Sequence, residues 1–356
     1  MIRHPENPLI TPAMIPPSHP ELEVLGAFNP GACRFGQEVI LVLRVAEGCP
    51  RTADGVAVPH YRFRPRDGGE PEGKLEVRHF RRDDPDLEIK DSRAVIHRGV
   101  EYVSTLSHLR LARSLDGVHF QVDPTPFWTP VDASEAYGVE DARITEIDGW
   151  YYINYTAVSP DSYGTSLIRT RDFVDVEYLG MIFPVPNKDV CLFPKKIGGR
   201  YYALHRPYNH GFGRSSIWIA QSPDLVHWGQ HRCLVRPREN GWEDEKIGGG
   251  APPLATADGW LEIYHGKALR QGRDHYSLGV LLLERDDPTR IRFRGAHPIL
   301  APQAPYETAG FVPNVVFASG VVPGEAGELL LYYAACDETT CLARCTVEEL
   351  VGGGKF

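Results

Sequence analysis

Apolar and polar residues alternate along most of this chain, in short runs that follow glycine-containing turns. Four runs show the pattern best: EIDGWYYINYTA (146–157), KIGGRYYALHRP (196–207), TADGWLEIYHGK (256–267) and GEAGELLLYYAACD (324–337). Alternation with a period of two predicts a half-buried β-strand, and a preceding Asp-Gly or Gly-Gly dipeptide predicts a hairpin turn. Helical periodicity is scarce, so the pattern predicts an all-β fold.

A second pattern recurs between these runs and gives the chain a weak internal repeat. The segments that share it are LRLARSLDGVHFQ (109–121), SLIRTRDFVDVEY (166–178), IWIAQSPDLVHWG (217–229) and, less closely, GVLLLERDDPTRIRF (279–293). Each has a β-rich run followed by an acidic turn, and Ser114, Thr170 and Ser222 are equivalent. Their spacing of about 50–60 residues is close to that of propeller blades. Five or six such units fit the chain, which favours radial closure over a β-sandwich or a double barrel.

One charged segment interrupts this regularity. Residues 50–95 contain GGEPEG and many charged side chains. We interpret the segment as a loop and hairpin excursion that serves as a candidate lid, and a disordered insert is the alternative. No linker divides the rest of the sequence, so we expect a single domain over residues 1–356.

Charge and cysteine content exclude several classes of function. The net charge of −9 argues against partners such as nucleic acid or an anionic membrane, which require a basic face. The sequence shows no secretion signal and no apolar run of about 18 residues, so we expect no membrane span. Its seven cysteines form no CxxC pair and no zinc-like cluster. Reduced thiols in a cytoplasmic protein without a metal are therefore expected.

Charged and amide residues interrupt otherwise apolar strands at corresponding places in each unit. The motifs are FNPGA (28–32), VLRVAEG (42–48), VEDARI (139–144), NKDVCLFP (187–194), LHRP (204–207), KIGGGAPP (246–253), YHGK (264–267), FVPNVVF (311–317) and AACDE (334–338). Buried charge is costly unless it is paired or used. Its recurrence at the repeat spacing predicts that these residues converge on a pocket at one mouth of a central channel.

Taken singly, each of these residues also has a plainer explanation. The alternatives are a strand-end ion pair for Asp141 with Arg143, a solvated turn for Lys188–Asp189, a strand-end cap for His205–Arg206, and simple turns for Asn29 and for the glycines after Lys246. Local patterns alone leave these alternatives open.

Taken together, the motifs resemble those of glycoside hydrolase family 130, the β-mannoside phosphorylases and related β-mannosidases. The resemblance covers nearly the whole chain, from NPLITP at residue 7 to AACDE at residue 338. Its most specific parts are FNPGA, LRLARSLDG, GVEDARI, NKDVCLFPKKIGGRYYALHRP, WEDEKIGGGAPP with DGWLEIYHGK, and YETAGFVPNVVFASG. It implies a five-bladed β-propeller with the active site at the mouth of the central channel, which agrees with the repeat count.

The resemblance also implies roles for individual residues. Asp141 matches the catalytic acid of the family. The residues implied to bind phosphate are Lys188, Arg206, Lys246, His265 and Tyr264, and those implied to bind the sugar are Asn29, Arg44, Arg143, Asp189, His205 and Asp337. The sequence departs from the family pattern at Ala142, where proline is expected, and at Glu245, which adds negative charge beside the presumed anion site.

The chemistry of glycosidic cleavage explains this combination of one acid and several cations. Inverting hydrolysis requires two carboxyl groups because water must be deprotonated, whereas phosphate is already an anionic nucleophile. We therefore expect an inverting β-mannoside phosphorylase that transfers mannose from a β-1,2- or β-1,4-linked mannoside to phosphate. The expected product is α-mannose 1-phosphate. The family resemblance implies that Asp141 donates its proton through the mannose 3-hydroxyl.

Two other functions remain as alternatives. An inverting β-mannosidase on the same fold would need a general base, for which Glu140, Glu243, Asp244 and Glu245 are candidates. A non-catalytic sugar-binding propeller is the second alternative, and the presence of Asp141 argues against it. The expected partners are a β-mannoside and inorganic phosphate as co-substrate, with no other cofactor; a homo-oligomer is compatible with the sequence.

Overall fold

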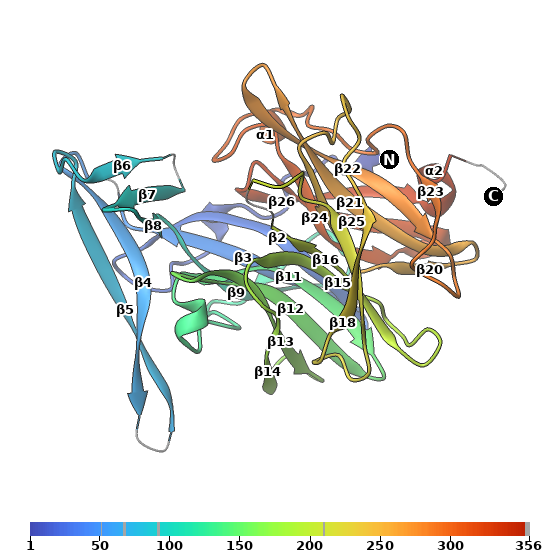
Figure 1. Ribbon diagram of the computed structural model, residues 1–356, viewed down its shortest axis with the longest axis horizontal. Helices are drawn as coiled ribbons and strands as arrows, with labels where there is room; N and C mark the ends of the chain where they lie inside the picture. The colour runs from blue at the N-terminus through green and yellow to red at the C-terminus, as the bar shows by residue number, and fades with distance from the viewer. Residues whose placement is uncertain (51, 67–68, 91–92, 209–210, 353–356) are drawn as a thin grey trace.

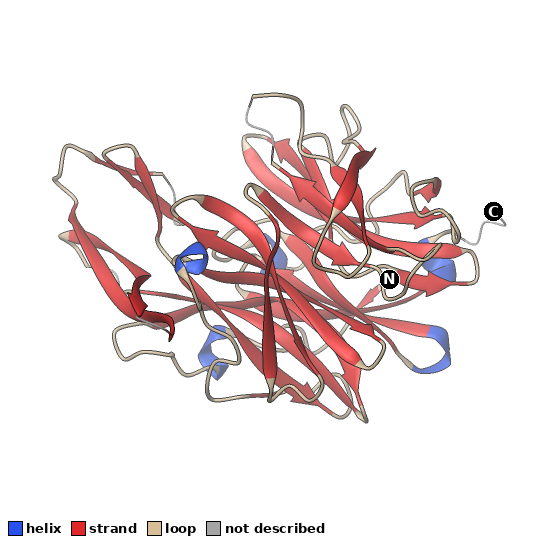
Figure 2. Ribbon diagram, turned by 60° about the horizontal axis from the view of Figure 1, so that its bottom comes forward, coloured by secondary structure: helices blue, strands red, loops and turns tan. Residues whose placement is uncertain are grey.

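Strands make up most of the molecule, and helices are limited to single turns (Figures 1 and 2). The computed structural model describes residues 1–50, 52–66, 69–90, 93–208 and 211–352. The helical turns are η1 (Pro12–Met14), η2 (Ala133–Glu135), α1 (Pro305–Thr308), η3 (Glu325–Gly327) and α2 (Val347–Leu350). None of the helices in this described part has the length and apolarity to cross a bilayer. The predicted all-β class is confirmed.

Four large antiparallel sheets form the body of the protein. The largest holds β2 (Glu23–Phe35), β3 (Glu38–Gly48), β9 (Leu106–Ser114), β10 (Gln121–Val122), β11 (Gly138–Ile147), β12 (Trp150–Ser159), β13 (Ser162–Thr170) and β14 (Val176–Phe183). The second holds β15 (Asn187–Leu192), β16 (Tyr201–Pro207), β17 (Ile217–Ser222) and β18 (Gly229–Val235). The third holds β19 (Lys246–Gly249), β20 (Leu254–Thr256), β21 (Gly259–Arg270), β22 (Arg273–Leu283) and β23 (Ile291–Arg294). The fourth holds β24 (Val316–Pro323), β25 (Glu328–Ala335), β26 (Thr339–Thr346) and β1 (Ile2–Arg3).

The eight-stranded sheet consists of two four-stranded meanders with a narrow junction. One parallel pair, Gly138 with Ser107, connects β11 to β9. Gly138 has a φ of 111°, and a Cβ there would meet the Ser107 backbone nitrogen at 2.6 Å. A residue without a side chain is therefore required for the two meanders to approach this closely.

Strand β1 joins the two ends of the chain. It pairs with β26, so Ile2 lies opposite Arg344 in the same sheet. The strands that begin successive meanders are in contact around the molecule: β24 contacts β2, β2 contacts β11, β11 contacts β15, and β15 contacts β19. We call β2, β11, β15, β19 and β24 the lining strands.

The apolar core lies between neighbouring sheets rather than in one central cluster. Leu261 and Val280 of the third sheet pack in one cluster with Val316 and Leu331 of the fourth. A separate cluster joins the second and third sheets. Alternation along each strand places one apolar set on each face, so both faces of these sheets are buried.

The repeated segments predicted from the sequence form equivalent turns at the outer ends of the sheets. The hydroxyl oxygens of Ser114, Thr170 and Ser222 each accept a hydrogen bond of 2.9 Å from the backbone N–H three residues later. The aspartate two positions after each hydroxyl residue accepts from two further backbone N–H groups. The weak repeat therefore marks a recurring turn whose backbone donors are satisfied locally.

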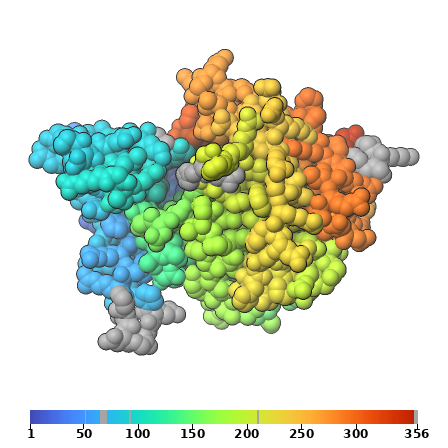
Figure 3. All heavy atoms as spheres, in the orientation of Figure 1, coloured from blue at the N-terminus to red at the C-terminus, as the bar shows by residue number. Residues whose placement is uncertain are grey.

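The charged segment forms a separate lobe beside the body (Figures 1 and 3). A long hairpin of β4 (Gly55–Arg66) and β5 (Gly69–Arg81) precedes a small sheet of β6 (Leu87–Ile89), β7 (Ala94–His97) and β8 (Val100–Val103). Val58, Phe80 and Tyr102 of this lobe cluster with Ala136 and Tyr137 of the body. The described part of the segment is therefore folded and packed on the body, unlike a disordered insert.

Candidate active site

A cavity of about 400 Å³ lies where the four large sheets and the lobe meet. Most of the residues proposed from the sequence line it: Asn29, Arg44, Asp141, Lys188, Asp189, Arg206, Lys246, His265 and Asp337. They come from β2, β3, β11, β15, β16, β19, β21 and the turn between β25 and β26. Residues more than 300 positions apart are thereby brought into one polar pocket.

Three of the lining strands present their polar residue from a β-bulge. The strand register shifts at Asn29 in β2, at Asp141 in β11 and at Asp189 in β15. These residues have φ values of 47°, 51° and 55°. Asn and Asp tolerate this left-handed conformation better than other residues with a Cβ. A bulge redirects a side chain out of the regular ladder, and here it accompanies a polar group that lines the cavity.

Asp141 lies within a set of donors and cations. Its Oδ1 accepts from Asn29 Nδ2 at 2.7 Å and from Arg44 Nη1 at 3.1 Å, and the residue is only 4 % exposed. Burial raises the pKa of Asp141, but the charges of Arg44, Lys188 and Arg143 outweigh it, so the pKa lies below its ordinary value. At neutral pH this carboxyl group is therefore ionised.

Asp189 is the centre of a second buried group. Its Oδ2 lies 2.5 Å from Arg206 Nε and 3.4 Å from His265 Nε2. Burial opposes ionisation of Asp189, but Arg206 and the surrounding positive charges keep its pKa below the ordinary value. Burial lowers the pKa of His265 to about 3, so this imidazole is neutral at pH 7 and offers an N–H group rather than a charge. Asp189 thus orients Arg206 and His265 at the cavity wall.

Two lysines supply positive charge without a carboxylate partner among the described residues. Lys188 Nζ lies 5.0 Å from the centre of the Tyr163 ring, and Lys246 Nζ lies 5.0 Å from that of Tyr276. Burial and the neighbouring cations Arg206 and Lys188 lower the pKa of Lys246 well below its ordinary value. An anion in the cavity would offset this repulsion.

The glycines after Lys246 are needed for close packing. A Cβ at Gly248 would lie 2.3 Å from Asp189 Oδ2 and 2.6 Å from His265 Cε1, and one at Gly249 would lie 2.7 Å from Cys191 Sγ. The run therefore lets the β19 backbone lie directly against the group around Asp189. The sequence had left open a simple turn for these glycines, whereas Gly248 and Gly249 belong to strand β19.

Three predicted site residues do not line the cavity. The Tyr264 hydroxyl donates to Glu243 Oε2 at 2.5 Å on the other face of β21 from His265, because neighbouring side chains of a strand alternate. His205 is within hydrogen-bonding distance of Asn187 and stacks on Phe183. Arg143 is buried and donates to backbone carbonyls. Direct ligand contact from these three is therefore not supported by this geometry.

The cavity also contains residues that the sequence analysis missed. Aromatic side chains line it at Phe28, Tyr163, Tyr276 and Phe317, and such rings suit the apolar faces of a sugar. Phe28 could have been found, because it directly precedes Asn29 in FNPGA. Tyr276 lies opposite Lys267 in the β21–β22 register, a relation that appears only once the strands are paired.

The lobe contributes further lining residues. Lys90, Arg93, Ala94, Glu101 and Val103 reach the cavity, and Lys90 Nζ lies 3.0 Å from Glu101 Oε1. The charged segment was expected to act as a candidate lid, and these residues place it at the cavity. Its charged pair adds hydrogen-bonding groups to the cavity.

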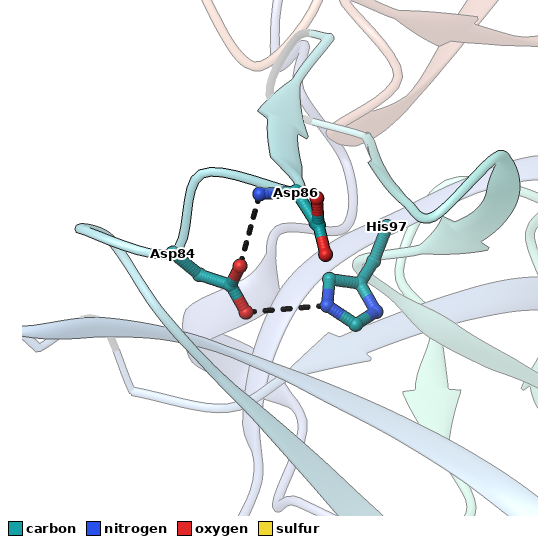
Figure 4. A group of neighbouring side chains, drawn as sticks. All are labelled: Asp84, Asp86 and His97. Atoms are coloured by element: carbon teal, nitrogen blue, oxygen red, sulfur yellow. Dashed lines mark hydrogen bonds and ion pairs between the residues drawn. The ribbon is translucent and has the colours of Figure 1, made fainter.

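A group with metal-ligand chemistry lies in the lobe outside this cavity. Asp84, Asp86 and His97 bring carboxylate and imidazole atoms within 4.8 Å of one another (Figure 4). Asp84 already accepts from the Asp86 N–H and contacts the His97 ring at 3.2 Å, and Arg98 pairs with Asp86 at 2.9 Å. These bonds account for the group as a stabilised turn at the start of β6.

Both the sequence and the fold of this chain are similar to those of known proteins. Residues 90–353 match the glycoside hydrolase family 130 profile, described as beta-1,4-mannooligosaccharide phosphorylase. A beta-1,2-mannobiose phosphorylase from Listeria innocua is 42 % identical over 352 residues, covering 97 % of this chain and 95 % of that protein. The solved structure of the Listeria innocua enzyme in complex with beta-1,2-mannobiose has a TM-score of 0.90 at 40 % identity, covering 99 % of this chain and 98 % of that one.

A more distant relative has a different linkage in its name. A beta-1,4-mannooligosaccharide phosphorylase from Ruminococcus albus is 32 % identical over 253 residues, covering 67 % of this chain and 73 % of that protein. The profile match spans well over half of the sequence, and the Listeria innocua relative matches nearly all of it. The chain therefore belongs to glycoside hydrolase family 130.

Proposed function

We propose that this protein is an inverting β-mannoside phosphorylase that cleaves β-1,2-mannobiose with inorganic phosphate to give α-mannose 1-phosphate and mannose. The names of its relatives support a β-mannoside phosphorylase. The choice of the β-1,2 linkage is supported by the relative that matches nearly the whole chain, whereas the Ruminococcus albus enzyme named for the β-1,4 linkage matches two thirds of it.

The composition of the cavity carries the choice of phosphate as nucleophile. The carboxyl group of Asp141 shares the cavity with Arg206 and with two lysines, Lys188 and Lys246, that have no carboxylate partner among the described residues. Arginine can hold a phosphate through two parallel hydrogen bonds, and lysine supplies a point charge. This set would hold an oxyanion and orient it toward the anomeric carbon.

In the proposed mechanism, Asp141 donates a proton to the leaving oxygen through the mannose 3-hydroxyl while phosphate attacks the opposite face. The cations around Asp141 hold its pKa below the ordinary value. A phosphate beside Lys188 would compensate one of these charges, and a sugar would displace water from the carboxyl group. Both changes raise the pKa of Asp141 toward the range that a general acid needs.

The hydrolase alternative requires a general base, and its four candidates are poorly placed. Glu140 lines the cavity, but its Oε1 lies 2.7 Å from Arg44 Nη2. Glu243 is fully buried against Tyr264 and Arg294, and Asp244 pairs with Arg270. Glu245 is exposed and does not line the cavity. None of these four residues is therefore well placed to activate a water in the cavity.

The propeller architecture is part of the same proposal. The eight-stranded sheet divides at the Gly138–Ser107 pair, which gives five meanders in chain order, and the lining strands contact one another around the cavity. Pairing of β1 with β26 would close the ring of blades. The lobe would then cover the channel mouth as a lid, on a single domain. The proposed chemistry requires no cofactor beyond phosphate.

Product analysis tests the proposal. The protein is incubated with β-1,2- or β-1,4-mannobiose, with and without phosphate, and mannose is resolved from mannose 1-phosphate. We expect phosphate-dependent α-mannose 1-phosphate, chiefly from the β-1,2 disaccharide.

Lys246→Met should raise the KM for phosphate by about 10- to 100-fold, the effect of losing one charged hydrogen bond. Lys195→Met is the matched control, since Lys195 also lies over an aromatic ring, that of Trp260, but outside the cavity. Free mannose at an unchanged rate without phosphate would refute phosphorolysis.

A further inference from the structure

Arg143 lies next to the cavity, in contact with the lining residues Asp141 and Asp189, and is only 1 % exposed. It follows Asp141 by two residues across the β11 bulge, and its Nη1 donates to the Asp141 carbonyl oxygen at 2.7 Å. Its Nε donates to the carbonyl oxygen of Gly250 at 3.1 Å, and Nη2 donates to that of Gly249 at 3.3 Å. One guanidinium group therefore fixes the peptide of the acid to the end of β19.

The same group reaches two further sheets. Arg143 Nη2 lies 3.5 Å from Asp189 Oδ1, and its Cζ lies 5.6 Å from the centre of the Phe317 ring in β24. It thus contacts residues from β15 and β24 as well as β19. The planar fork of arginine suits several acceptors at once, whereas a lysine would offer a single ammonium group.

The backbone that Arg143 holds is restrained from its other side as well. The Gly250 N–H donates to Glu262 Oε1 at 3.0 Å. A Cβ at Gly250 would lie 2.2 Å from the carbonyl oxygen of Ile263 and 2.9 Å from that of Ala318. The segment after Lys246 is therefore restrained by Arg143 on one side and by residues of β21 and β24 on the other.

We propose that Arg143 is a positioning residue that holds Asp141 in register with the phosphate-binding residues of β15 and β19. This inference rests on the proposed function, and it replaces the sugar-binding role that the sequence had implied for Arg143. The residue acts through the peptide of Asp141, through Asp189 and through the strand that carries Lys246. Misplacement of reacting groups by about 1 Å can cost about 100-fold in rate.

Arg143 also contributes to the charge state of the acid. Its positive charge is one of the influences that lower the pKa of Asp141. A neutral replacement should therefore raise that pKa, whereas lysine should preserve it. Because a general acid must be protonated, the alkaline limb of the kcat profile reports this pKa in the enzyme–substrate complex.

The test compares Arg143→Lys and Arg143→Met with Arg110→Lys. Arg110 is a fully buried arginine that donates to the carbonyl oxygens of Pro16 and Pro124, away from the cavity. We expect Arg143→Lys to lower kcat by about 10- to 100-fold, with the KM for mannobiose changed by less than about threefold. Its alkaline limb should stay in place, and that of Arg143→Met should move to higher pH. Arg110→Lys should lower thermal stability and leave kcat and its pH profile unchanged.

Several outcomes would overturn the inference. A large rise in the KM for mannobiose at constant kcat would make Arg143 a sugar contact. Wild-type kinetics in Arg143→Lys, or an equal loss of kcat in Arg110→Lys, would remove the positioning role. Circular dichroism checks that each variant folds, and Arg143→Lys decides the question if Arg143→Met does not. If the wild type instead releases mannose without phosphate, phosphorolysis fails, yet a selective kcat loss in Arg143→Lys would still show that Asp141 depends on Arg143.

Discussion

The outer turns and the bulges of the lining strands use the same backbone conformation for different purposes. Phe173 and Leu225 in the outer turns have φ values of 59° and 72°, close to the 51° of Asp141 and the 55° of Asp189. In the outer turns the residue with positive φ is apolar and buried, and nearby hydroxyl and carboxylate groups satisfy the backbone. At the bulges it is polar, and its partners come from other strands.

The outer turns repeat as structural elements, whereas the bulges hold the residues that we propose for catalysis. An outer turn is completed by residues within a few positions of one another, so each copy can form independently. A bulge at the cavity is completed only when other strands pack beside it, because Asp141 needs Asn29 and Arg44, and Asp189 needs Arg206 and His265. Changes at the bulges should therefore affect catalysis, and changes at the outer turns should affect stability.

The largest effect is expected at the acid. Asp141→Asn removes the proton donor while keeping the shape of the side chain, so kcat should fall by about 1,000-fold or more. Thermal unfolding should show that the fold is retained. Asp224→Asn at an outer turn is the control and should leave kcat near the wild-type value. Comparable activity in Asp141→Asn would exclude Asp141 as the general acid.

A close approach at β19 should give the next largest effect. Gly248→Ala places a methyl group against Asp189 and His265, and we expect a loss of about 1–3 kcal/mol in the free energy of unfolding together with weaker phosphate binding. Urea unfolding and the KM for phosphate measure the two effects. Gly229→Ala in β18 is the matched control, because a Cβ there has no atom within 4 Å. Equal behaviour of the two variants would show that the packing at Gly248 is not required.

Asp337 should couple stability to pH. Burial raises its pKa to about 6, above the value near 4 expected in the unfolded chain. The stability that this group contributes is therefore present below about pH 4 and is lost as the pH rises through about 6. Asp337→Asn lacks this titration, so relative to the wild type it should gain about 1–3 kcal/mol between pH 5 and pH 8. Urea unfolding at both pH values tests this, and a pH-independent difference would contradict it.

The smallest effect is expected at an outer turn. Ser222→Ala removes the acceptor for the N–H groups of Asp224 and Leu225, and should cost about 1 kcal/mol of unfolding free energy. The kinetic constants should remain unchanged, since this turn lies outside the cavity. A fall in kcat of tenfold or more in a folded Ser222→Ala protein would break the separation between the two regions.

The sequence alone was sufficient to predict the alternating strands, the outer turns and most of the cavity residues. Alternation and turn dipeptides act over a few residues, so they identify EIDGWYYINYTA or LRLARSLDG without any tertiary contact. The motifs around Asp141, Asp189 and Lys246 were visible because charged residues interrupt apolar strands. They indicated that a polar pocket exists, and the resemblance to family 130 supplied its chemistry.

Only the tertiary structure decided which of these residues reach the cavity. Side chains alternate along β21, so His265 lines the cavity and Tyr264 is directed to Glu243, although both belong to one motif. Arg143 was separated from the sugar-binding set because it donates to the backbone carbonyls of Gly249 and Gly250, more than 100 residues away in sequence. Tyr276 and the lobe residue Glu101 join the site through strand pairing and packing between sheets, and neither leaves a local sequence signal. Short-range patterns determine the elements, and long-range packing determines which face of each element becomes the site.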